Sequence, residues 1–196
     1  MGTWYDERMK ERTEKLFTKR TVLLEGEVNS NNLEQTRRLI QLLQTESETP
    51  ITLLIDSHGG KADAAVHFYD FVRSEITVPL VGRVCGKCAS AATIVLQACQ
   101  PRLATRHSWF LVHSVALEIS PLINRPEFRY GADLEGAARF MIQNAHDLQT
   151  ITDKIIQRHS RQPMKVIRSW NRAGDRRLAP FRALEAKRRG LIDRVI

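Results

Sequence analysis

The sequence lacks the long apolar segments and the cysteine framework of several protein classes. No apolar run approaches the ~18 residues that a membrane-spanning helix requires. The first twenty residues are charged throughout and have no apolar signal core, so secretion is not expected. Three cysteines form an odd set, which predicts no disulfide framework and favours a reducing cytoplasm. With no repeat or low-complexity tract either, the 196 residues predict a single globular domain.

The charge is uneven along the chain. Lys and Arg number 30 against 22 Asp and Glu, a net charge of +8, yet the last 39 residues alone hold twelve basic and three acidic residues. Such a cluster can bind a phosphate backbone or an acidic partner, or it can be a solvated basic face. Lys165, Arg168 and Arg172 are spaced to share one helical face, which allows a nucleic-acid hypothesis. We expect only weak, non-specific binding to nucleic acid.

Strand-like and helix-like segments alternate along the first 115 residues. Helical spacing of Leu33, Thr36, Ile40 and Leu43 follows the first strand-like run. This alternation predicts an α/β fold in which helices wrap a parallel sheet. Strands are predicted over Thr21–Val28, Ile51–Ser57, Thr77–Gly86 and Ser108–Val115, and further helices over Ala62–Val72 and Ala89–Ala98.

A long helix is predicted after a proline-containing break at Ile119–Tyr130. Apolar residues recur at helical spacing over Ala132–His159, which would form a helix about 42 Å long. That length exceeds the width of so small a core, so part of the helix is expected to project and pack against another subunit. A short helix around Met164–Trp170 and a final strand at Gly190–Ile196 complete the chain.

Ser90 is a candidate nucleophile because of the small residues around it, in Gly86-Lys87-Cys88-Ala89-Ser90-Ala91-Ala92. A serine near a helix N-terminus meets free backbone N–H groups, which would stabilise the oxyanion formed when its hydroxyl attacks a carbonyl. The same residue could instead be a simple helix N-cap. The motif differs from the G-x-S-x-G elbow of α/β-hydrolases, because Cys88 and Ala92 stand at the glycine positions.

Three further features could belong to the same site. His113 lies near the end of an apolar strand, at the edge of the sheet where parallel folds place their sites. Asp175 could hold an imidazole in the correct tautomer. Gly59-Gly60 follows a strand directly and would let an anionic oxygen approach uncovered N–H groups. Each feature could instead have a purely structural role. His113 could be a half-buried histidine, Asp175 a loop residue and Gly59-Gly60 a plain turn.

Cys85-x-x-Cys88 offers a competing chemistry. With Cys99 and a histidine it could complete a zinc or redox site. However, Cys85 falls in a strand-like run, and no second cysteine pair or closely spaced histidine pair follows. We therefore expect neither a metal nor an organic cofactor.

Taken in order, these segments resemble the proteolytic subunit of the Clp protease family over residues 21–196. The family's Ser-Pro-Gly-Gly, Gly-Gln-Ala-Ala-Ser-Met and Met-Ile-His-Gln are similar to Ser57–Gly60, Gly86–Ala91 and Leu111–Ser114. The Tyr69-Asp70 pair and the closing stretch Glu185–Asp193 also resemble the family. The resemblance implies a ClpP- and crotonase-like α/β fold of stacked β-α-β units.

The resemblance also implies how the chain is organised. Residues 21–196 would form one peptidase domain with a long projecting handle helix near 132–159, and residues 1–20 would form an axial N-terminal segment. The activity implied is that of a serine endopeptidase in which Ser90 attacks the scissile carbonyl, His113 is the general base and Asp175 orients it. The backbone N–H groups of Gly60 and Ala91 would form the oxyanion hole.

The partners implied by the resemblance are unfolded polypeptides and an ATP-dependent AAA+ unfoldase that delivers them. The peptide would be held as an added strand near Gly59–Ala62 and Ser114–Tyr130. The subunits would form a homo-oligomeric ring, a heptamer or a tetradecamer, in the cytoplasm and without a membrane partner.

The sequence departs from the family at several positions. His58 replaces a proline, Ser114-Val115 replaces Gln-Pro, and Asp175 lies about three residues farther from the closing Glu-Ala than the family pattern. Asn171 is therefore a second candidate for orienting His113. Two other functions stay open: a catalytically silent ring subunit, and an acyl-CoA enzyme of the crotonase fold, which would not need the Ser90–His113 pair.

Overall fold

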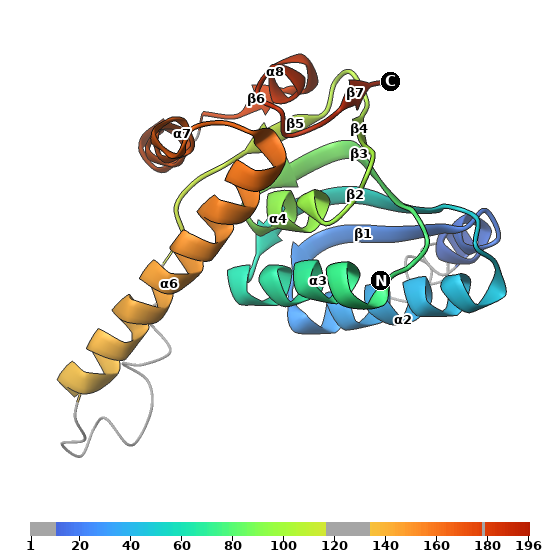
Figure 1. Ribbon diagram of the computed structural model, residues 1–196, viewed down its shortest axis with the longest axis horizontal. Coiled ribbons are helices and arrows are strands. Elements are labelled where there is room, and N and C mark those ends of the chain that lie inside the picture. Colours follow the sequence, from blue (N-terminus) through green and yellow to red (C-terminus); the bar gives the residue numbers. More distant parts are fainter. Residues whose placement is uncertain (1–10, 117–133, 178) are drawn as a thin grey trace, which may run out of the picture.

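The computed structural model describes residues 11–116, 134–177 and 179–196, and the predicted break at Ile119–Tyr130 falls outside these ranges. A twisted sheet forms the centre, helices cover it, and one long helix extends away from it (Figure 1). The sheet order is β1-β2-β3-β4-β7, with β5 beside β3 and β6 beside β5. No helix within the described ranges combines the length and the apolar composition needed to cross a bilayer.

The first half of the fold follows the predicted alternation. Strands β1 (Thr21–Val28) and β2 (Ile51–Gly60) pair in parallel and are joined by helix α2 (Ser30–Glu46). The buried residues of α2 are the four apolar-face residues predicted from their spacing, and Asn29 caps the helix by accepting a hydrogen bond from the Asn32 amide. Helix α3 (Ala62–Glu75) returns the chain to the sheet.

Strand β3 (Leu80–Ala89) changes partners along its length, and this divides the sheet. Its first half pairs in parallel with β4 (Arg102–Ala104), and its second half pairs in parallel with β5 (Trp109–Leu111). The predicted strands Thr77–Gly86 and Ser108–Val115 were therefore shifted or too long. Between the two halves, the Asp56 carboxylate occupies the space where a side chain at residue 86 would lie, so that position requires glycine.

Helix α4 (Ala91–Gln97) is entirely buried, as predicted for its alanine-rich sequence, although it is shorter than Ala89–Ala98. It packs against α3 and β2, and its small side chains let the surrounding elements approach closely. Because α4 begins directly after Ser90, the packing of this helix fixes where β3 ends.

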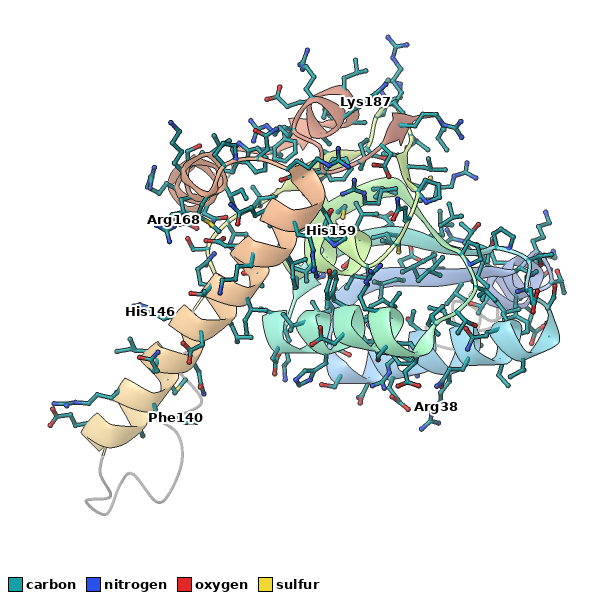
Figure 2. The ribbon with its side chains drawn as sticks, in the orientation of Figure 1. Arg38, Phe140, His146, His159, Arg168 and Lys187 are labelled. Carbon is teal, nitrogen blue, oxygen red and sulfur yellow. The ribbon has the colours of Figure 1, made fainter. Side chains whose placement is uncertain are left out.

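Helix α6 (Leu134–Ser160) confirms the predicted long helix and leaves the body of the molecule at its N-terminal end (Figure 1). At 27 residues it is about 40 Å long. Its last turns are anchored by Ile155 and Ile156, which are buried in the core, whereas Phe140 near the outer end is 66% exposed (Figure 2).

The C-terminal segment is more helical than predicted. Helix α7 (Met164–Arg177) is twice the length of the predicted Met164–Trp170, so Asp175 lies in a helix and not in a loop. The chain then forms β6 (Phe181–Arg182), α8 (Ala183–Arg188) and β7 (Arg194–Val195), where only a final strand was predicted. β6 is antiparallel to β5, which makes the sheet mixed.

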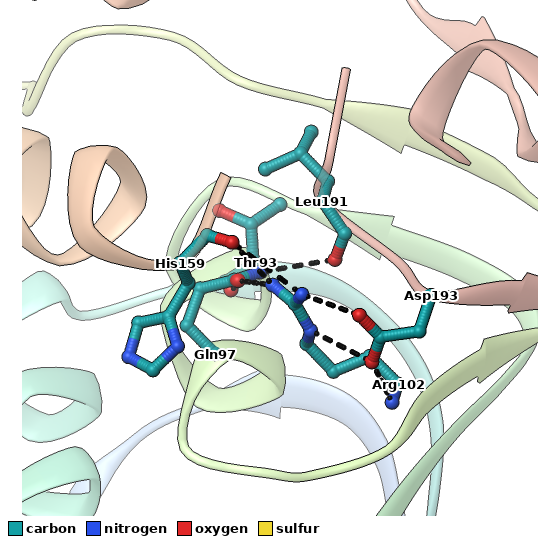
Figure 3. A network of polar contacts seen from close by, with 6 residues as sticks. All are labelled: Thr93, Gln97, Arg102, His159, Leu191 and Asp193. Carbon is teal, nitrogen blue, oxygen red and sulfur yellow. Dashed lines mark hydrogen bonds and ion pairs between the residues drawn. The ribbon is translucent and has the colours of Figure 1, made fainter. Parts of the chain in front are cut away.

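A polar network around Arg102 ties the C-terminal segment to the core (Figure 3). The guanidinium pairs with the Asp193 carboxylate at 2.7 Å and donates to the side-chain oxygen of Gln97. The Gln97 amide donates to the Thr93 and Leu191 carbonyls at 3.3 Å. Because β7 is only two residues long, these side-chain contacts help to keep it paired with β4.

The described part of the N-terminal segment contacts the domain. Residues 11–17 are helical, and Phe17 packs against the core. The Arg20 guanidinium donates to the carbonyls of Leu43, Ser47 and Thr49, each at 2.8 Å. Phe17 thus attaches the end of this segment to the core, and Arg20 attaches it to α2 and the loop after it.

Candidate functional site

The turn at the end of β2 is held by a buried serine. Ser57 Oγ donates to the Gly26 carbonyl at 2.6 Å and accepts from the Gly59 amide at 3.1 Å. Gly59 and Gly60 both have positive φ, at 94° and 152°, which favours glycine. The bond to Ser57 occupies the Gly59 amide, whereas the oxyanion hole implied by the family resemblance uses the amide of the next residue, Gly60.

Ser90 occupies the turn between β3 and α4 in a strained backbone conformation. Its φ and ψ are 54° and −127°, and a positive φ at a non-glycine residue is uncommon. The turn is held because the Ser90 amide donates to the Leu111 carbonyl at 2.8 Å. Gly59 lies against it: a Cβ at residue 59 would come within 2.6 Å of the Ser90 Cβ. Ser90 stands at the N-cap position of α4, but its side chain makes no cap hydrogen bond, so capping does not account for the hydroxyl.

His113 lies two residues beyond the end of β5, the strand that pairs with β3 next to Ser90. Ala89 pairs with Leu111 in the β3–β5 ladder, so the residues that immediately follow them, Ser90 and Val112–His113, leave the sheet side by side. His113 Nδ1 lies 2.6 Å from the Ser114 carbonyl, which can only accept, so Nδ1 carries a proton. In the neutral ring, Nε2 is then the free acceptor, which is the tautomer that a general base needs.

Asp175 lies beside His113 but bonds mainly to the next residue. Its Oδ1 is 4.0 Å from His113 Nδ1, beyond hydrogen-bond distance. The same carboxylate accepts from the Ser114 amide at 2.9 Å and from the Ser114 hydroxyl at 2.7 Å. The structure therefore brings the predicted base and orienting acid together, with Ser114 between them.

Helix α7 reaches this position because residue 174 is glycine. A Cβ there would lie within 2.8 Å of the His113 Cβ and would also collide with the Val112 backbone. Close contact between α7 and the strand that carries the base is thus possible only without a side chain. Gly174 was not predicted from the sequence, although its position directly before the candidate residue Asp175 could have pointed to it.

Asn171, the second candidate for orienting His113, belongs to a buried network between α6 and α7. Its Nδ2 donates to Asp153 Oδ1 at 2.8 Å, and Gln149 Nε2 donates to the same oxygen at 2.7 Å. Gln149 Oε1 in turn accepts from the Val115 amide at 2.6 Å, two residues after His113. Asn171 Oδ1 is buried without a partner. The sequence analysis missed Gln149 and Asp153.

One pocket of about 540 Å³ collects the predicted site residues. Ser90 and His113 line it with Gly60 and Ala91, the two predicted oxyanion-hole residues, and with Asn171. The outer wall is one face of α6, from Met141 to Ile156. Asp175 does not line this pocket, since Ser114 lies between it and the cavity. No hydrogen bond joins Ser90 to His113, both of which are described.

The cysteines do not form a shared site. Cys85 is exposed, whereas Cys88 and Cys99 are buried. Burial raises the pKa of the Cys99 thiol to about 12 and also raises that of Cys88, which keeps both protonated and poor ligands. Within the described residues, no group of three or more His, Cys, Asp or Glu side chains could hold a metal ion.

Comparison with known proteins gives related sequences and related structures. The chain is 36% identical over 103 residues to "ATP-dependent Clp protease proteolytic subunit 2" of Treponema denticola, a match that covers 51% of each chain. It is 28% identical over 136 residues to "ATP-dependent Clp protease proteolytic subunit 1" of Protochlamydia amoebophila, covering 68% of this chain and 63% of the relative. The matches thus span about half to two-thirds of these curated relatives.

Two solved structures share the fold. One is a single-residue variant of ClpP1 from Listeria monocytogenes, with a TM-score of 0.76, 22% identity and coverage of 94% of this chain and 95% of that chain. The other is the ClpP protease catalytic domain from Plasmodium falciparum, with a TM-score of 0.74, 20% identity and coverage of 95% and 90%. The predicted ClpP-like α/β fold is confirmed. Residues 5–196 match the sequence profile of the family described as Clp protease, and the chain therefore belongs to that family.

Proposed function

We propose that this chain is a serine endopeptidase subunit that cleaves unfolded polypeptides inside an oligomeric ring. The observation that supports this most strongly is the pairing of β3 with β5, which puts Ser90 and His113 at the ends of adjacent strands beside one pocket. Membership of the Clp protease family supports the same reaction. Residues 21–196 would form the peptidase domain.

In the proposed reaction, Ser90 Oγ attacks the scissile carbonyl carbon while His113 Nε2 takes the hydroxyl proton. The protonated imidazole then passes that proton to the leaving amine, which frees one peptide product and leaves an acyl-enzyme. Water, activated by the same histidine, releases the second product. Asp175 would orient His113 and stabilise the imidazolium.

The proposed reaction requires a local rearrangement around His113. The ring must bring Nε2 within hydrogen-bond reach of Ser90 Oγ, and Nδ1 must exchange the Ser114 carbonyl for the Asp175 carboxylate, now 4.0 Å away. Catalytic hydrogen bonds are often long until substrate binds, so this distance does not exclude the mechanism. Substrate binding or ring assembly would supply the change.

The backbone amides of Gly60 and Ala91 would stabilise the tetrahedral oxyanion. Loss of one such donor typically costs about 10²–10³ in kcat. The peptide would be held as an added strand beside Gly59–Ala62, because backbone pairing tolerates many side chains. The family relatives carry "ATP-dependent" in their names, and we infer an AAA+ unfoldase as the partner that supplies extended chains.

The test is mass spectrometry of the assembled protein after treatment with a fluorophosphonate, alongside a Ser90→Ala control. Phosphonylation confined to Ser90 is the expected result, because only an activated hydroxyl displaces the fluoride. A His113→Ala variant should lose the adduct as well. Labelling elsewhere, or labelling that survives in Ser90→Ala, would contradict the assignment.

A catalytically silent ring subunit is the second candidate. It is favoured by one observation, that Ser90 and His113 share no hydrogen bond while His113 Nδ1 bonds to the Ser114 carbonyl. An assembled protein that forms no adduct with the fluorophosphonate would identify this alternative. Turnover of an acyl-CoA thioester that survives Ser90→Ala would instead identify a crotonase-type enzyme.

A further inference from the structure

A second cavity lies beside the candidate catalytic pocket, between α6 and α7. It has a volume of about 350 Å³ and shares four lining residues with the larger pocket: Ser114, Gln149, Asp153 and Asn171. Its remaining walls come from α6 and α7, where His146 and Arg168 lie along the same edge of the molecule (Figure 2). The two cavities are therefore adjacent, with these shared side chains between them, and we call the second cavity the α6–α7 groove.

The groove is lined by two arginines without ionic partners. Arg168 and Arg172 lie one helical turn apart on α7, both exposed, and neither forms an ion pair with any described carboxylate. The acidic side chain in the groove is Asp153, which is 5% exposed and already accepts hydrogen bonds from Gln149 and Asn171. The accessible charge of the groove is therefore positive.

Two other arginines of the protein are paired within the fold. The guanidinium carbon of Arg189 lies 4.2 Å from the centre of the Phe181 ring, and the same group pairs with Glu185 at 2.8 Å. The charge of Arg189 is therefore neutralised within the fold. Arg102 is likewise paired with Asp193. Arg168 and Arg172 have no ionic partner among the described residues, and they line a concave site that reaches Ser114, the residue after the candidate catalytic histidine, which is an arrangement suited to binding an anion.

We propose that the α6–α7 groove is a subsite for a peptide carboxylate, which gives the peptidase a preference for acidic polypeptide segments. The proposal rests on the peptidase function proposed above. A planar guanidinium binds a carboxylate through two parallel hydrogen bonds, and two of them within one turn suit a single Asp or Glu side chain or a free C-terminus. The carboxylate would lie between Arg168 and Arg172, with Ser114 on the side of the catalytic pocket.

The test measures peptide binding apart from cleavage, by fluorescence anisotropy on the Ser90→Ala protein. Three labelled peptides of one extended sequence are compared: one with a central Glu and an amidated C-terminus, one with Gln and an amidated C-terminus, and one with Gln and a free C-terminus. We expect the Glu peptide to bind roughly 5-fold more tightly than its amidated Gln counterpart, with the advantage falling as salt rises. If only the free C-terminus gives the advantage, the subsite binds product termini.

The matched variants carry substitutions on one helix. Arg168→Gln with Arg172→Gln should remove the advantage of the Glu peptide, whereas Lys165→Gln, an exposed change on α7 outside the groove, should retain it. Circular dichroism of each variant shows that α7 remains folded. Equal affinity for all three peptides, or an advantage that survives loss of both arginines, would overturn the proposal.

Two further measurements separate this proposal from its alternatives. If the fluorophosphonate labels the wild-type protein but the Ser90→Ala protein binds the Glu and Gln peptides equally, the subsite is refuted and the peptidase function stays in place. A preference for the Glu peptide without labelling would refute the peptidase and keep a carboxylate-binding groove. A single-stranded oligonucleotide that binds more tightly than the Glu peptide, and needs both arginines, would overturn the proposal in favour of a phosphate ligand.

Discussion

Ser90 shows how single residues set the geometry of the site. A serine with φ of 54° is strained by about 1–3 kcal/mol, and such strain persists only where the surroundings impose it. Here the surroundings are the Ser90–Leu111 hydrogen bond and the bare backbone of Gly59. The strain fixes the exit of the chain from β3 and with it the position of the hydroxyl.

Substitution of Gly59 should therefore disable the nucleophile. In Gly59→Ala the new Cβ would lie 2.5 Å from the Ala89 carbonyl oxygen and 2.6 Å from the Ser90 Cβ, so the turn must move. We expect phosphonylation of Ser90 to slow at least about 10²-fold, since small displacements of a nucleophile have effects of this size. Gly26→Ala is the matched control: φ is also positive at 80°, but no atom lies within 4 Å of its Cβ. Equal loss in both variants would contradict the steric argument.

His159 makes stability depend on pH. Burial lowers its pKa to about 4, and Arg102 adds to the effect, while Tyr69 Oη holds its Nε2 at 2.8 Å. The unfolded chain takes up a proton near pH 6.5 and the folded chain does so only near 4, so stability present above pH 6.5 is lost as the pH falls toward 4. The thermal midpoint should decrease across this window, and less so in His159→Gln, which can still bond to Tyr69. An identical pH profile in the variant would exclude His159 as the cause.

The residues of the candidate site were largely predictable, but their contacts were not. Ser90, His113 and Asp175 were identified from motif order, and the structure brings all three into one region. The role of Ser114 in binding Asp175 could not be predicted, because it depends on where α7 meets the segment that follows β5. Gly174 was missed for the same reason. The lack of space for a Cβ at this position arises from its packing against His113, which is 61 residues away in the sequence.

At the scale of elements, the contact between α6 and α7 contains a buried polar network. Asp153 on α6 accepts hydrogen bonds from Asn171 on α7 and from Gln149. Gln149 in turn accepts a hydrogen bond from the backbone amide of Val115, two residues after His113. A buried group that loses its partner costs about 1–3 kcal/mol, so the three side chains act as one unit. The network links the outer wall of the catalytic pocket to the segment that carries the base.

Removal of the Asp153 carboxylate should loosen this contact. Asp153→Ala leaves the amide groups of Asn171 and Gln149 without their acceptor, and we expect the free energy of unfolding to fall by about 1–3 kcal/mol in urea titration. Asp147→Ala is the control, because Asp147 is an exposed residue of α6 whose side chain, among the described residues, bonds to Gln143 alone. Its effect should stay within about 0.5 kcal/mol. Comparable losses in the two variants would show that the buried network is not responsible.

The elements that sequence analysis placed well are those with a periodic apolar pattern. Helices α2 and α6 were predicted to within a few residues, because their apolar spacing extends over several turns. The short elements β4, β6 and α8 were missed, since two to six residues carry no period. β3 was misplaced at its end because its continuation past Gly86 depends on the change of partner from β4 to β5.

The projecting end of α6 is the largest feature at the scale of the whole molecule. Phe140 and Ile142 are exposed there and Ile151 is exposed farther along the helix, although apolar side chains of this size normally avoid water in a group. The wall of the catalytic pocket is part of the same helix. A partner that covers this end would therefore also restrain the pocket.

Self-association through α6 should depend on these side chains. Phe140→Asp places a charge on a side chain that is 66% exposed, and we expect a lower sedimentation coefficient in analytical ultracentrifugation than for the wild type. Leu42→Asp is the control, since Leu42 is 55% exposed on α2, away from the projecting helix. An assembly that tolerates Phe140→Asp, or one that dissociates equally with Leu42→Asp, would show that this end of α6 is not the interface.

The ladder between β3 and β5 has one more consequence. It is three residues long, and the Ser90 amide proton lies just past its end, bonded to the Leu111 carbonyl. Exchange of that proton for deuterium requires the strand that carries the nucleophile to separate from the strand that carries the base. Its protection factor therefore measures how stably the segments that carry Ser90 and His113 are held side by side, in the free chain and in any larger assembly.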